Sequence, residues 1–139
     1  MKKNILLLVS LCFCFYQNAN SQYCLGDDEN RVMLYAKSSK DYLLIKKQII
    51  SKDYFTISWY NTEIRARQTA YFKNRICTKF SISPDNDNST KDIVEIIERK
   101  AIKKSETEWK EYTMGKVIKI VLNYLADVDK YIFNFTEIK

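Results

Sequence analysis

The sequence predicts an α+β fold, in which two helices cover one face of an antiparallel β-sheet built from a meander and a C-terminal hairpin. Three observations predict it. Apolar and polar residues alternate from Phe55 to Ile82, the alternation returns between residues 117 and 138, and a helical spacing of apolar residues follows Ser89. A period of two is typical of strands with one buried face, and a period near 3.6 is typical of amphipathic helices.

The chain begins with the features of a secretory signal peptide. These are a basic start, a short apolar run and a small-x-small cleavage site: Met1–Asn4, Ile5–Tyr16 and Ala19-Asn20-Ser21. We therefore expect residues 1–21 to be removed as a signal peptide and residues 22–139 to form a single α+β domain, exported to the periplasm or the extracellular space. An uncleaved N-terminal anchor is the alternative, although the apolar run is short for a bilayer.

Charge and cysteine content agree with export. The formal net charge of the 139 residues is +6. Loss of Lys2 and Lys3 with the leader leaves 21 basic against 17 acidic residues, a net charge of +4, which is compatible with anionic partners. Of four cysteines, only Cys24 and Cys77 remain, and an oxidising compartment favours a disulfide between them. Two free thiols are the alternative.

A helix and an edge strand are expected before the meander. Asp27 and Asp28 lie at the start of a segment that places Val32, Tyr35 and Ala36 on one helical face. The segment from Tyr42 to Ile50 is strongly apolar without clean alternation, which favours a strand whose register cannot be read.

The turns of the meander determine its register. A two-residue loop at Asn61-Thr62 sets Trp59 opposite Ile64, and a three-residue loop at residues 73–75 sets Phe72 opposite Ile76. On the polar side, this register sets Ser58 opposite Arg65 and Thr56 opposite Arg67. It also places the Cys77 side chain on the polar side of its strand.

The second half of the chain is expected to hold a helix and the C-terminal hairpin. Ser89 predicts a helix N-cap, and the residues at helical spacing after it are Ile93, Ile96, Ile97 and Ala101. A short strand is expected at Trp109–Tyr112. Residues 117–125 and 130–138 then form a hairpin that sets Leu122 opposite Phe133 and Ile120 opposite Phe135. The sequence shows no internal repeat.

Composition excludes several kinds of site. The absence of histidine removes Ser-His-Asp and Cys-His catalysis and most zinc sites, and two glycines cannot make a Gly-rich phosphate loop. The segment Asp85-x-Asp87-x-Ser89 matches only the first half of a calcium loop. We expect no catalytic residue, metal or cofactor. Glu106, Glu108 and Glu111 are the carboxylates that an alternative function, a small envelope hydrolase, would use.

The polar side of the meander is the strongest candidate for a binding surface. It is expected to carry Tyr54, Tyr60, Arg65, Arg67, Tyr71 and Lys79. Arginine makes bidentate contacts to phosphate or carboxylate, and tyrosine provides stiff contact area. The sequence therefore favours an exported, non-enzymatic interaction protein whose partner is a protein or an anionic envelope component. Nucleic acid is disfavoured by the leader, and a structural envelope subunit is a further alternative.

Overall fold

The computed structural model describes residues 23–139, so the predicted signal peptide, residues 1–21, lies outside the described residues. The elements in chain order are α2 (Glu29–Lys37), β1 (Tyr42–Ser51), β2 (Tyr54–Asn61), β3 (Ala66–Lys73), β4 (Ile76–Pro84), α3 (Asp87–Glu98), β5 (Ile102–Ser105), β6 (Glu108–Thr113), β7 (Lys116–Leu125), the 3₁₀ turn η1 (Ala126–Val128) and β8 (Lys130–Ile138). The predicted class is confirmed: within residues 23–139 an eight-stranded antiparallel sheet accompanies two helices.

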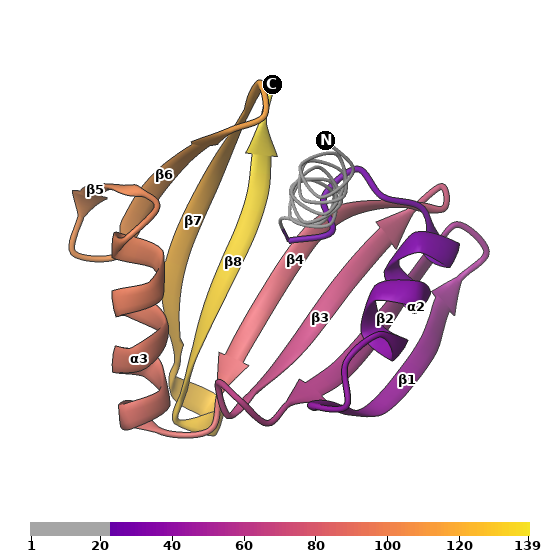
Figure 1. Ribbon diagram of the computed structural model, residues 1–139, viewed down its shortest axis with the longest axis horizontal. Helices are drawn as coiled ribbons and strands as arrows, with labels where there is room; N and C mark the ends of the chain where they lie inside the picture. Colours follow the sequence, from indigo (N-terminus) through magenta and orange to yellow (C-terminus); the bar gives the residue numbers. More distant parts are fainter. Residues whose placement is uncertain (1–22) are drawn as a thin grey trace, which may run out of the picture.

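The order of elements repeats, although the sequence does not. A helix followed by a four-stranded meander occurs twice, and the strand order β1-β2-β3-β4-β8-β7-β6-β5 joins the two meanders through their last strands. Figure 1 shows β4 and β8 side by side in the middle of the sheet, with β1 and β5 at its two ends. The register at this seam sets Ser81 opposite Asn134.

Two tryptophans occupy matching places in the two halves. Trp59 on β2 pairs with Gln68 on β3, and Trp109 on β6 pairs with Ile120 on β7. We call the side of the sheet that carries them the tryptophan face, and the opposite side the polar face. The buried aromatic rings of the tryptophan face are Trp59, Phe72, Phe80, Trp109, Phe133 and Phe135, each at most 2% exposed.

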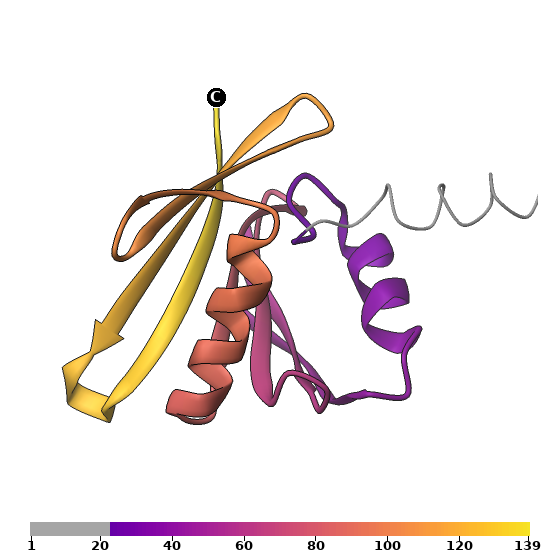
Figure 2. The same cartoon turned by 60° about the vertical axis from the view of Figure 1, so that its left-hand side comes forward.

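Each helix contacts one of these tryptophans. The N-cap carboxylate of α2 is Asp28, which accepts a hydrogen bond from the Arg31 amide, and Tyr35 of this helix meets the Trp59 ring edge-on at 5.9 Å. At α3, the Trp109 Nε1 donates to Glu98 Oε1 over 3.4 Å. Figure 2 shows α3 beside the second half of the sheet and α2 beside the first.

The predicted N-cap of α3 is wrong by three residues. Asn86 is the N-cap, and its side-chain oxygen accepts a hydrogen bond from the Ser89 amide over 3.0 Å. Ser89 is inside the helix and fully buried. The side chain of Asn accepts this bond as well as that of Ser, so the turn-rich segment contained two competing caps.

The first turn of the meander is longer than predicted. Asn61 pairs with Ala66, which leaves a four-residue loop, because the Asn61 side chain accepts a hydrogen bond from the Glu63 amide and stabilises a turn there. Trp59 therefore faces Gln68 rather than Ile64. The shift is even, so the residues of β2 and β3 keep their predicted faces.

The second turn is shorter than predicted. Lys73 pairs with Ile76 across Asn74 and Arg75, whose φ values of 51° and 68° are those of a two-residue hairpin. A bulge follows, because Phe72 pairs with Cys77 while Tyr71 pairs with Lys79. The extra residue turns Cys77 into the core instead of leaving it on the polar side.

The predicted Cys24–Cys77 disulfide is wrong. Both cysteines are free and buried, at 1% and 2% exposure. The N-terminal turn is instead joined to β4 by backbone hydrogen bonds: the Gly26 amide donates to the Cys77 carbonyl, and the Cys77 amide donates to the Asp27 carbonyl. The Cys77 thiol donates to the Lys79 carbonyl over 3.4 Å.

The C-terminal hairpin is confirmed in register, with Leu122 opposite Phe133 and Ile120 opposite Phe135. The short strand β5, which has only exposed residues, was not predicted from the sequence. No helix within residues 23–139 has the length and apolar character to cross a membrane.

Candidate functional site

A row of lysines crosses the polar face. Lys110 on β6 lies directly opposite Lys119 on β7, and Lys119 pairs in turn with Thr136 on β8. Lys79 on β4 continues the same side of the sheet, with its ammonium 4.8 Å from the centre of the Tyr71 ring. Like charges directly opposite each other in a sheet repel, and here the Glu108 carboxylate, 3.3 Å from the Lys119 ammonium, offsets part of the repulsion. We call Lys79, Lys110 and Lys119 the lysine row.

Acidic side chains are nearly absent from the polar face. Between residues 23 and 139 only three acidic residues lie in strands, and two of them, Glu111 and Glu137, point to the tryptophan face. The third is Glu108, whose carboxylate lies 3.3 Å from the Lys119 ammonium. The remaining acidic residues between 23 and 139 belong to helices and loops. The polar side of the sheet is therefore basic, and most of the acidic residues lie in loops and helices.

The centre of the polar face is neutral and rich in hydrogen-bonding groups. Ser81 is 2% exposed, and its hydroxyl donates to the Tyr71 hydroxyl over 3.3 Å. Opposite Ser81, the Oδ1 of Asn134 is buried and has no hydrogen-bond partner within residues 23–139. A buried acceptor without a donor costs about 1–3 kcal/mol.

Most residues of the predicted patch lie on the polar face, and one does not. Tyr54, Tyr60, Arg67, Tyr71 and Lys79 have this parity in β2, β3 and β4. The Tyr60 hydroxyl donates to Asp85, and this hydrogen bond raises the pKa of Tyr60. Arg65 lies instead in the β2–β3 turn with a φ of 49°, and its guanidinium lies 3.4 Å from Asp92 of α3. Arg65 is therefore not part of this surface.

The three glutamates of the hydrolase alternative do not converge. Glu106 has a side chain that is 93% exposed, and its carboxylate contacts Lys103. Glu108 is on the polar face beside Lys119, whereas Glu111 is buried on the tryptophan face and accepts a hydrogen bond from the Tyr23 hydroxyl. Acid–base hydrolysis of a glycoside needs two carboxyl groups across one cleft, and these lie on opposite sides of a sheet.

Several residues of the segment that resembles half of a calcium loop have structural roles. Asp85 accepts from Tyr60, Asn86 caps α3, and Ser89 is buried within that helix. In the part of the chain that the structure describes, no group of three or more His, Cys, Asp or Glu side chains is arranged to hold a metal ion.

Sequence reasoning missed two members of the lysine row. Lys119 has polar parity in the predicted C-terminal hairpin, so its face could have been read from the alternation. Lys110 lies in a strand of six residues with an irregular pattern, and its position opposite Lys119 depends on the β6–β7 register. Only the long-range pairing of β4 with β8 brings these lysines onto the same surface as Lys79.

Comparison with known proteins found no relative: no family model, curated protein or solved structure matches the chain.

Proposed function

We propose that residues 22–139 act as an exported, non-enzymatic binding protein, and that the polar face of the sheet docks on an acidic surface of a partner protein. The observation that carries this proposal is the lysine row, in which Lys110 and Lys119 face each other with one carboxylate, Glu108, beside them. An acidic partner would relieve this repulsion and steer its own approach to the face.

The arrangement of the helices supports the same surface. Through Tyr35 and Glu98, α2 and α3 contact the two tryptophans, and we infer that both helices cover the tryptophan face. The polar face is then the broad surface available to a partner. It carries several tyrosines, and tyrosine is one of the residues enriched in protein interfaces.

A folded protein explains this face better than an anionic polymer does. The lysine row adjoins a neutral centre of serine, asparagine and tyrosine, which is suited to individual hydrogen bonds. A polyanion would be bound chiefly by charge density, and a net charge of +4 after leader removal is modest.

The proposal is tested by capture from the native envelope and secreted fractions with two sets of variants. The test variant carries Lys79→Glu and Lys110→Glu. Its fold should be retained. A glutamate at position 110 would face Lys119, and the replaced Lys79 and Lys110 have no carboxylate partner within residues 23–139. Capture of an acidic protein should fall by about tenfold or more, which corresponds to about 1.4 kcal/mol or more of binding free energy.

The control variant carries Lys37→Glu and Lys91→Glu, which make the same change in net charge on the two helices. It should capture the partner as the wild type does. Equal capture by the test variant contradicts the proposal. Capture that survives protease treatment of the fractions would identify a polymer and would also contradict it.

A further inference from the structure

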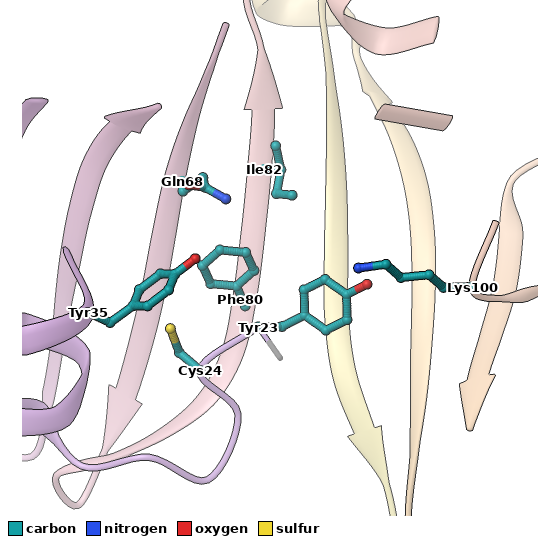
Figure 3. A pocket seen from close by; sticks show the side chains of 7 residues that line it. All are labelled: Tyr23, Cys24, Tyr35, Gln68, Phe80, Ile82 and Lys100. Atoms are coloured by element: carbon teal, nitrogen blue, oxygen red, sulfur yellow. The ribbon is translucent and has the colours of Figure 1, made fainter. Parts of the chain in front are cut away.

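A cavity of about 180 Å³ opens on the tryptophan face, where the two halves of the molecule meet. Figure 3 shows side chains from the N-terminal turn, α2, β3, β4 and the segment after α3 around it. Phe80 and Ile82 of β4 form an apolar wall, and the Tyr35 ring contributes on the α2 side. This site lies on the opposite side of the sheet from the lysine row, so it goes beyond the function proposed above.

A buried amide points into the cavity. Gln68 is 7% exposed, and its Oε1 accepts hydrogen bonds from Trp59 Nε1 over 2.8 Å and from Asn61 Nδ2 over 3.2 Å. Because both partners are donors, the orientation of the Gln68 amide is fixed, with its oxygen toward them. Its NH₂ group then points to the cavity, as Figure 3 shows. Within residues 23–139 this NH₂ group has no acceptor.

A cation lies at the other side of the cavity. The Lys100 side chain extends toward the cavity and the Tyr23 hydroxyl in Figure 3. Lys100 is exposed, and no carboxylate pairs with it in the described part of the chain. Gln68 and Lys100 therefore offer the cavity one neutral and one charged donor, a combination suited to an organic anion.

The carboxylate closest to the cavity wall is Glu111, which is not a lining residue and accepts the hydrogen bond of the Tyr23 hydroxyl over 2.7 Å. None of the residues that line the cavity is acidic. Burial, more than any other cause, raises the pKa of the Cys24 thiol and of the Tyr35 hydroxyl, so both groups are neutral at physiological pH. The Tyr35 hydroxyl is also hydrogen-bonded to the Tyr42 hydroxyl over 2.8 Å.

The size of the cavity limits the apolar part of a ligand. A cavity of about 150 Å³ is known to hold benzene. The present cavity is slightly larger, so it can take one ring or a short branched chain against Phe80 and Ile82.

We infer that this cavity binds a small organic monocarboxylate, whose compact apolar body packs against Phe80 and whose carboxylate accepts a hydrogen bond from Gln68 while Lys100 balances its charge. The occupant accepts a hydrogen bond from the NH₂ group of Gln68, and it joins the two halves of the molecule across their seam.

The test is titration calorimetry of the purified protein with phenylacetate and isovalerate, and with phenylacetamide as the neutral counterpart of phenylacetate. At least one carboxylate should bind, and the amide should bind about tenfold more weakly or worse, since it lacks the charge that Lys100 balances. Absence of binding by both carboxylates at about 10 mM, a concentration that would detect millimolar affinity, would overturn the inference. Equal affinity for phenylacetate and phenylacetamide would also overturn it.

Two variants locate the binding. Gln68→Glu keeps an acceptor for Trp59 and Asn61 but replaces the NH₂ donor with a carboxylate oxygen, so it should weaken carboxylate binding about tenfold or more. Lys100→Gln should also weaken carboxylate binding. Because Lys100 is exposed, this variant should fold, and it provides the test if Gln68→Glu does not fold. The matched controls are Gln48→Glu on β1 and Lys104→Gln on β5, which should bind as the wild type does. Binding that is unaffected by both cavity variants, or magnetic resonance contacts showing that residues preceding Tyr23 fill the cavity, would refute the proposed site.

Discussion

Replacing Trp59 by alanine is expected to lower the free energy of unfolding by about 3–5 kcal/mol, the usual cost of removing a large buried aromatic side chain. Trp59 is fully buried, and its ring lies about 6 Å from the rings of Tyr35, Tyr42 and Phe80. The change therefore leaves a cavity among rigid side chains, which cannot collapse to fill it. Urea unfolding followed by far-UV circular dichroism measures the effect.

Trp109, at the matching position in the second half, allows a milder comparison. Phenylalanine replaces each tryptophan in turn, which serves if the alanine variant is too unstable to fold. Trp59→Phe removes the 2.8 Å hydrogen bond to Gln68, which is buried, whereas Trp109→Phe removes a 3.4 Å bond to Glu98. The Glu98 side chain is 42% exposed and also contacts Lys103, whereas the Gln68 oxygen is buried and would keep only the longer 3.2 Å bond from Asn61. Trp59→Phe should therefore cost about 1 kcal/mol more than Trp109→Phe. A larger loss for Trp109→Phe contradicts this account of the core.

The two core thiols are expected to react with iodoacetamide at pH 8 about a thousandfold more slowly than a normal cysteine, because the thiolate is the reactive form. Burial raises the pKa of Cys77 from 9.0 to about 12. Burial likewise raises the pKa of Cys24, and the neighbouring Cys77 adds to the effect.

The same shifts predict the direction of the pH effect on stability. Below pH 9 the thiols are protonated in both the folded and the unfolded chain, so their contribution to stability is constant. Above pH 9 the unfolded chain ionises its thiols and the folded chain does not, so stability falls as the pH rises toward 12. Peptide mass spectrometry after timed alkylation measures the rates, with Ser51→Cys as an exposed reference. Labelling at the reference rate, or a linked Cys24–Cys77 peptide, would show that this description of the thiols is wrong.

The C-terminal hairpin could be predicted in register because its largest apolar residues share one face and its loop is of even length. Leu122 and Phe133 therefore face each other as expected. The meander was harder, because neither Gly nor Pro marks its turns. Asn61 and Asn74 both make turns there, but neither residue alone shows how long the loop is.

The bulge at β4 was beyond the reach of pattern reasoning. A single extra residue places Cys77 in the core, and nothing in the alternation marks it. The lysine row and the cavity depend on contacts between distant segments. Lys79 shares a surface with Lys119 only because β4 pairs with β8, and Gln68 and Lys100 line one cavity only because the two halves meet at that seam. Local periodicity predicts the face of a residue, but not which residues of a distant strand share it.

The most direct measurement of the central claim, that the polar face is the binding surface, is lysine acetylation of the protein with and without its captured partner. The lysine row is accessible in the free protein; the Lys119 side chain, for example, is 40% exposed. We expect Lys79, Lys110 and Lys119 to be protected in the complex, and Lys37 and Lys91 on the helices to react as before. Unchanged modification of the lysine row, with protection at Lys37 or Lys91 instead, would place the partner on the helices and contradict the account.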